Sequence, residues 1–198
     1  MKKRQDYVLW FEECDLQSIP LVGGKNASLG ELIKAGIPVP PGYAVTTKAY
    51  NLFLEQGNIK KEIFDALKSV TADDVVSGEK ASKKIRAIIE NTSMGYELQD
   101  YIGEFYRRLS KKSNVPAVPV AVRSSATAED LPGASFAGQQ DTFLWIRGVD
   151  DIFKHVKNAG QAFLPPGQSI IEQKWVLTTS RWRFPLVSRK WQMHGQQV

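Results

Sequence analysis

The sequence predicts an α+β fold, and two kinds of pattern lead to that prediction. Short runs rich in β-branched and aromatic residues, such as YVLWF at 7–11 and VAVRSS at 120–125, are typical of strands. Longer segments, such as 77–91, repeat their apolar residues with the period of an amphipathic helix. With 198 residues, 42% of them hydrophobic, the chain is long enough for one domain or two small ones with a packed core.

The first elements are marked by capping and turn residues. After the strand at 7–11, a loop runs to the segment VGGK at 22–25. A helix is predicted to begin there, because Asn26 or Ser28 can cap it and an apolar face follows. Gly36, together with the proline that follows it, ends this helix.

Residues 38–110 are predicted to hold one short strand and four helices. The PVPPG turn at 38–42 leads into the strand YAVTT, and a helix follows over about 48–55. Three further amphipathic helices fit residues of about 59–69, 77–91 and 95–110. The basic side chains of the second of these lie largely off its apolar face, so they indicate a solvated surface.

The last regular elements surround a loop of small residues. The strand at 120–125 ends in Arg123 and two serines, the loop spans 126–140, and a strand at 141–146 and a helix from about 148–157 follow. Beyond Lys157 the apolar residues follow neither the helical nor the strand period over any length. We therefore divide the chain into an organised region, 1–157, and a tail, 158–198, that we expect to be poorly ordered.

Charge, cysteine content and hydrophobicity argue against nucleic-acid-binding, secreted and membrane proteins. The net charge is +5, but the tail contributes most of it, and the organised region lacks a clustered basic face, so no nucleic-acid partner is expected. The single Cys14 cannot form an intramolecular disulfide, and we expect a cytoplasmic protein. No secretory signal is recognised, and no apolar run is long enough to cross a membrane, so no membrane partner is expected.

The VGGK segment can form a phosphate-binding turn. Glycines let a ligand approach the backbone, N–H groups are exposed at a helix N-terminus, and Lys25 adds a cation. The alternative is a glycine turn that carries a surface lysine, because short glycine motifs occur often by chance.

Arg123 is the second candidate. It follows an apolar strand, and its guanidinium can bind phosphate through two hydrogen bonds. The alternative is a structural ion pair. The loop after it carries hydroxyls, among them those of Ser124 and Ser125, with glycines and acids, a mixture typical of a flap that closes over phosphates. An ordinary surface loop is the alternative for this segment, although loops of this length are usually functional or disordered.

Catalytic and metal-binding groups are not predicted. His155 lies in a predicted helix without a partner that could orient it as a base, which favours a packing or surface role. No cysteine and histidine cluster has the spacing of metal ligands.

Three segments together resemble the phosphoenolpyruvate synthase (pyruvate, water dikinase) and pyruvate phosphate dikinase family. They are the opening YVLWFEE, the segment VGGKNASLGELIKAGIPVPPGYAVTTKAY and the segment VAVRSSATAEDLPGASFAGQQDTFL, and the similarity covers about residues 6–157. The resemblance is to the N-terminal ATP-binding domain, and it implies an ATP-grasp-like fold with a mixed sheet and flanking helices. Rifampicin phosphotransferase shares this domain type, but KNASLGEL after the glycines is closer to the synthase.

The resemblance also implies site residues and a reaction. Lys25 and Arg123 would contact ATP phosphates, and Gly138 and Thr142 would belong to the flap and strand that line the nucleotide. The family converts ATP, pyruvate and water to phosphoenolpyruvate, AMP and phosphate, with Mg²⁺. The family's metal ligands, phosphohistidine domain and pyruvate-binding barrel have no counterpart in this sequence, so we expect an ATP-binding portion that is inactive alone. The alternative is a stand-alone nucleotide-binding module that another chain completes.

The tail suggests a frameshift hypothesis. If KNAG at 157–160 is encoded AAA AAT GCT GGN, restoring one A yields KKCW, and compatible codons continue as ASLFTARAI and then YRAKMGFDHFKVALSVGVQKMANAR. This continuation resembles that of the family. On this hypothesis the basic charge and the tryptophans of 158–198 carry no functional message.

Overall fold

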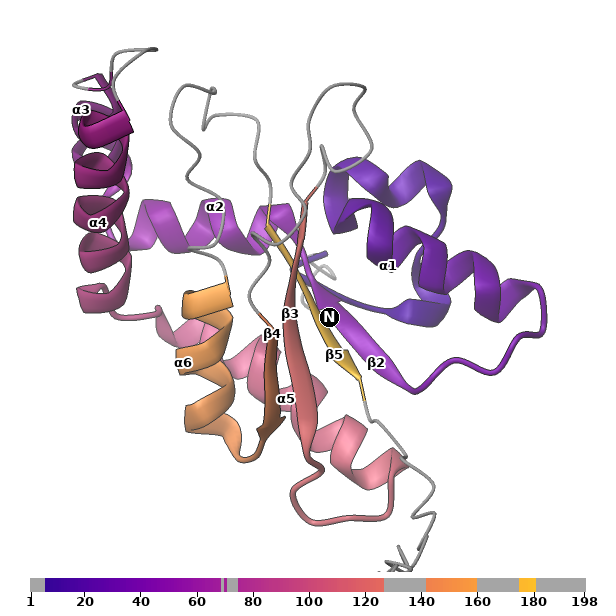
Figure 1. Ribbon diagram of the computed structural model, residues 1–198. Coiled ribbons are helices and arrows are strands. Elements are labelled where there is room, and N and C mark those ends of the chain that lie inside the picture. The colour runs from indigo at the N-terminus through magenta and orange to yellow at the C-terminus, as the bar shows by residue number, and fades with distance from the viewer. Residues whose placement is uncertain (1–5, 69, 71–74, 127–141, 160–174, 181–198) are drawn as a thin grey trace, which may run out of the picture.

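The computed structural model describes residues 6–68, 70, 75–126, 142–159 and 175–180. Its centre is a five-stranded sheet of order β1-β2-β5-β3-β4 (Figure 1). The strands are β1 (Val8–Trp10), β2 (Gly42–Val45), β3 (Val120–Ala126), β4 (Thr142–Ile146) and β5 (Trp175–Ser180). The α+β prediction is confirmed. The resemblance implied a mixed sheet, whereas every described strand pair is antiparallel. The strand β5 lies between β2 and β3 and runs antiparallel to both.

Helices cover both faces of this sheet. They are α1 (Ile19–Lys34), α2 (Thr47–Gln56), α3 (Lys60–Lys68), α4 (Val75–Asn91), α5 (Tyr96–Lys112) and α6 (Val149–Ala159), with short 3₁₀ turns η1 (Phe11–Glu13) and η2 (Leu16–Ser18) before α1. Figure 1 shows α1 on one side of the sheet and the remaining helices on the other. We call these sides the α1 face and the helical face. The predicted helices agree with these bounds within a few residues, except that α1 begins before VGGK.

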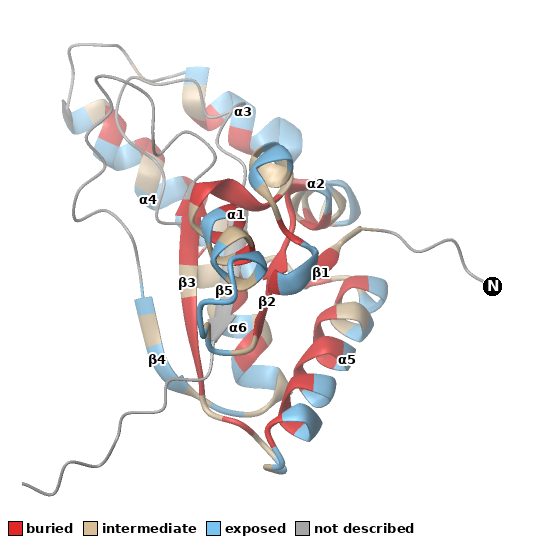
Figure 2. Ribbon diagram, turned by 90° about the vertical axis from the view of Figure 1, so that its right-hand side faces the viewer, coloured by how far each residue is buried: buried red, intermediate tan, exposed pale blue. Residues whose placement is uncertain are grey.

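The helical face carries the main core. Alternate residues of β1, β2 and β3, including Val8, Tyr43 and Val122, point there and pack against buried residues of α2 to α6. Figure 2 shows buried residues along β2 and β3 and along the inner side of α5. The hydroxyl of Tyr106 donates to the carbonyl of Val118 at 3.0 Å and accepts from the amide of Gly148 at 2.9 Å. The buried hydroxyl of Tyr106 is therefore satisfied within the protein.

The α1 face carries a smaller core. Its buried residues are Leu9, Cys14, Val22, Ala27 and Ala44. Helix α1 approaches the η1 turn so closely at Gly30 that a Cβ there would overlap the backbone carbonyl of Cys14. Glycine is therefore required at this contact, because any side chain would force the helix away.

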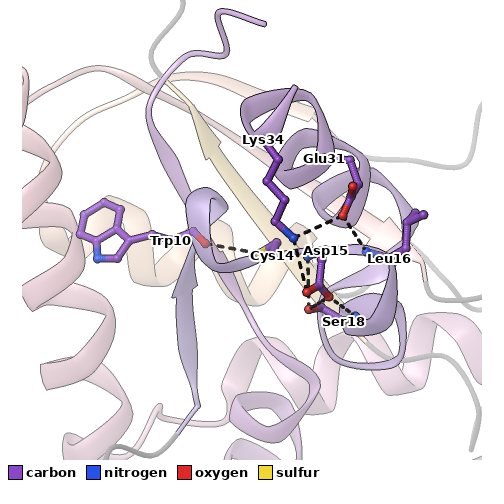
Figure 3. Close-up of polar contacts among 7 residues, drawn as sticks. All are labelled: Trp10, Cys14, Asp15, Leu16, Ser18, Glu31 and Lys34. Atoms are coloured by element: carbon purple, nitrogen blue, oxygen red, sulfur yellow. Dashed lines mark hydrogen bonds and ion pairs between the residues drawn. The ribbon is translucent and has the colours of Figure 1, made fainter. Parts of the chain in front are cut away.

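A polar network fixes the start of α1 (Figure 3). Asp15 accepts hydrogen bonds from the backbone amide of Ser18 at 2.9 Å and from its hydroxyl at 2.7 Å. Lys34 forms ion pairs with Asp15 at 3.4 Å and with Glu31 at 3.3 Å. The hydrogen bond with Ser18, followed by the charge of Lys34, lowers the pKa of Asp15 below its usual value. The two ends of α1 are thus tied to the same turn.

One strand arises in the segment where no pattern was predicted. β5 comes from 158–198, yet it pairs with β2 from Gly42 to Val45 and with β3 from Ala121 to Ala126. Its sequence, WVLTTS, is rich in residues that favour strands, but it is short and its neighbours show no period. The pairing of β5 depends on tertiary contacts that a local pattern does not contain.

Candidate functional site

Helix α1 is interrupted at the predicted phosphate-binding turn. Gly23 has φ 73° and ψ 162°, so one short helical turn ends before it and a second helical segment begins after it. A positive φ of this kind favours glycine over any other residue. The break explains why the sequence predicts a helix start at VGGK although the helix assignment begins at Ile19. The backbone after Gly23 is therefore a helix N-terminus, which attracts anions.

Lys25 follows this break directly. It is half-buried, whereas its neighbours Gly24 and Asn26 are buried. The side-chain amide of Asn26 donates to the carbonyl of Val22 at 2.8 Å, across the break. Asn26 thus stabilises the turn from inside, and it does not act as the helix cap that the sequence suggested.

Arg123 and Thr142 are cross-strand partners. Arg123 lies within β3 and is directly opposite Thr142, the first residue of β4, and opposite Thr178 of β5. Arg123 is half-buried and Thr142 is exposed. Arg123 forms no ion pair with any other residue that the structure describes. The described residues therefore offer no support for the alternative of a structural ion pair.

The sheet places these residues on the α1 face. Directly opposed residues of an antiparallel pair point to the same face. Leu9 pairs with Ala44, and the same row continues through β5 to Arg123 and Thr142. Leu9 and Ala44 pack with Val22 and Ala27 of α1. Arg123 and Thr142 thus share a face with the helix that carries Lys25.

Two buried hydroxyls follow Arg123. The strand predicted at 120–125 includes Ser124 and Ser125, and β3 does contain both, because β5 pairs with it as far as Ala126. Ser124 is 5% exposed and Ser125 is 1% exposed. Neither hydroxyl has a hydrogen-bond partner among the described residues. Sequence reasoning noted these hydroxyls but could not show that they are buried in a sheet.

Two other predictions have different outcomes. Gly138 lies outside the described residues, as does the predicted flap from Thr127 onward. His155 lies in α6, where its Nδ1 is 2.8 Å from the carbonyl oxygen of Asp151 and its ring packs edge-on against Phe143. The interpretation of His155 as a packing residue is confirmed.

The described residues can supply positive charge and hydroxyls, but they do not form a metal site by themselves. Among them, no group of three or more histidine, cysteine, aspartate or glutamate side chains could hold a metal ion. No helix in the described part of the chain is long and apolar enough to span a membrane. The arrangement of a cation, a guanidinium, hydroxyls and a helix N-terminus suits an anion with several oxygens.

Known proteins with similar sequences identify the family of this chain. The family model described as the pyruvate phosphate dikinase AMP/ATP-binding domain matches residues 19–164. A protein of Staphylothermus marinus, named as a probable phosphoenolpyruvate synthase, is 46% identical over 157 residues, which cover 78% of this chain and 19% of that protein. The phosphoenolpyruvate synthase of Helicobacter pylori is 45% identical over 156 residues, covering 77% and 19%, and that of Aquifex aeolicus is 42% identical over 160 residues, covering 79% and 19%.

The matches cover most of this chain but only a small part of each relative. The chain spans about a fifth of the length of these relatives. The family model, in contrast, covers well over half of this chain, including Lys25, Arg123 and Thr142. This chain belongs to the pyruvate phosphate dikinase AMP/ATP-binding domain family.

Proposed function

We propose that this chain binds ATP as the first part of an ATP-grasp-like domain of a phosphoenolpyruvate synthase, with Lys25, Arg123, Gly138 and Thr142 at the nucleotide. The observation that carries this proposal is the pairing of Arg123 with Thr142 on the α1 face. The helix break at Gly23 lies in the helix that covers this face. A phosphate chain needs cations and N–H donors together, and this face offers both.

In the complete reaction these residues would position phosphates. Phosphoryl transfer depends on neutralising charge and on in-line placement, which the ammonium of Lys25 and the guanidinium of Arg123 can assist. Mg²⁺ would supply further charge neutralisation when it enters with the nucleotide. The phosphates themselves are ligands for Mg²⁺, so an acidic cluster within this chain is not required for its entry.

Calorimetric titration of the 198-residue chain with MgATP tests the proposal. We expect saturable binding that weakens about 10- to 100-fold in Lys25→Ala and in Arg123→Ala, because each loses a charged contact. Matched controls are Lys154→Ala and Arg107→Ala, which remove exposed cations from α6 and α5. Absence of binding by a folded wild-type chain, or equal losses in the control variants, contradicts the proposal.

We further propose that the chain does not form phosphoenolpyruvate alone, because it spans only about a fifth of the relatives that carry that name. An assay of phosphoenolpyruvate formation from MgATP and pyruvate should give none. The alternative, a module that a second chain completes, predicts formation when the remaining part of a phosphoenolpyruvate synthase is added as a separate polypeptide.

We also propose that the chain divides into an organised region, 1–157, and a tail, 158–198, and that the tail arose by a frameshift. The family match ends at residue 164, near the predicted boundary. The gene sequence tests the hypothesis directly, because codons that do not permit the restored frame contradict it. Truncation after Ala159 tests whether the tail belongs to the fold. We expect a clear loss in the free energy of unfolding, because β5 pairs with both β2 and β3. An unchanged free energy of unfolding would show that the tail contributes nothing to the stability of the fold.

A further inference from the structure

The hydroxyl of Ser125 is an unexplained polar group in a buried position. Ser125 is 1% exposed, and its Oγ has no hydrogen-bond partner among the described residues. Most buried polar side chains in folded proteins are hydrogen-bonded to protein or to water. The hydroxyl of Ser125 is therefore available to a ligand that reaches the face to which it points.

Strand geometry gives Ser125 a defined direction. Residues two apart in a strand point to the same face, so Ser125 shares the α1 face with Arg123. The regular pairing of β3 with β5 from Ala121 to Ala126 keeps this alternation intact. Two residues along a strand span about 7 Å, which is within the length of a nucleotide's phosphate chain. Ser124 has the opposite direction, with Val122, toward the helical face.

We propose that Ser125 is a further phosphate-binding residue, whose hydroxyl donates a hydrogen bond to an oxygen of the nucleotide's phosphate chain beside Arg123. This inference rests on the proposed function and extends it to a residue outside the four named there. A guanidinium pairs with two oxygens of one phosphate group, so other oxygens of the chain still need donors. A hydroxyl that has no partner in the free protein breaks no bond when it binds, which favours affinity.

The neighbouring serine supplies a matched control. Ser124 and Ser125 are the same residue type, adjacent, buried and without a described partner, but they point to opposite faces. Ser125→Ala should weaken MgATP binding about tenfold, because a hydrogen bond to a charged oxygen is lost. Ser124→Ala should leave MgATP affinity unchanged. Both variants are small changes within β3, so their stability should be similar to that of the wild type.

Two measurements on the full chain decide the proposal. Calorimetry gives the MgATP affinity of the wild type, Ser125→Ala, Ser124→Ala and Lys25→Ala, and thermal unfolding without nucleotide gives their stability. A specific loss of affinity in Ser125→Ala with unchanged unfolding temperature supports the role. If Lys25→Ala weakens binding but Ser125→Ala does not, the role of Ser125 is overturned while the proposed function stands. Equal losses in both serine variants also overturn it, and no binding by the wild type overturns both proposals.

Discussion

The two faces of the sheet differ in the size of their cores and in the charged and polar groups beside them. On the helical face, the hydroxyl of Tyr106 both donates and accepts a hydrogen bond within a large apolar core. On the α1 face, a small core lies beside a break in α1 at Gly23, a half-buried Arg123 and the unpartnered hydroxyl of Ser125. The helical face carries the larger apolar core, whereas the α1 face combines a small core with the break in α1 and the charged Arg123. A buried hydroxyl without a described partner occurs on both faces, at Ser124 and at Ser125, so the faces differ in core size and in charge.

The strongest test of this comparison is a cavity in the helical face. Leu109 of α5 is fully buried in the main core. Leu109→Ala should lower the free energy of unfolding by about 2–5 kcal/mol, because apolar burial is lost and a cavity remains. Urea denaturation measures this change. Leu144→Ala, at a leucine of β4 that is 56% exposed, is the control and should change stability by less than about 0.5 kcal/mol. Similar losses in both variants contradict the assignment of stability to the helical face.

A second test pushes α1 away from the sheet. Gly30→Ala should lower the free energy of unfolding by about 1–3 kcal/mol, because the new methyl group meets the backbone of Cys14 and Phe11. It should also weaken MgATP binding, since α1 carries Lys25. Gly103→Ala is the control, because a Cβ in α5 meets only the side chains of Arg107, Val149 and Phe153. Denaturation and calorimetry should show smaller losses of stability and of MgATP affinity in Gly103→Ala than in Gly30→Ala. If Gly30→Ala keeps the full MgATP affinity, the position of α1 does not matter for binding.

A third and smaller effect comes from Cys14 in the α1-face core. Burial, followed by the negative charges of Glu13 and Asp15, raises the pKa of its thiol from 9.0 to about 12. A thiol with a raised pKa in the folded state stabilises the fold below the unfolded pKa, and this stability is lost as the pH rises from about 9 toward 12. We expect a loss of about 1 kcal/mol by pH 10 relative to pH 8.

The comparison with Cys14→Ala isolates this contribution, since other groups that titrate at high pH are shared by both proteins. Denaturation at pH 8 and pH 10 should show the steeper loss in the wild type. A parallel dependence in the two proteins would mean that the thiol ionises as easily in the folded chain as in the unfolded one.

The elements were predictable where a local pattern determines them. The amphipathic periods of α4 and α5 and the glycines of α1 are patterns within short stretches of sequence. Together with the strand-like runs, they predict the α+β fold. From residue type and position, the sequence could also propose Lys25 and Arg123 as candidate phosphate contacts. It could not predict that Arg123 pairs with Thr142, because strand register across an intervening segment is fixed by tertiary contacts. For the same reason it missed β5 and the burial of Ser125.

The pairing of Arg123 with Thr142 has a consequence for the length of the chain between them. The segment that follows Ala126 ends at Thr142, so it starts and ends on strands that the sheet holds side by side. The entropy cost of closing such a segment rises only slowly with its length. A change of length after Ala126 therefore need not move Arg123 or Thr142.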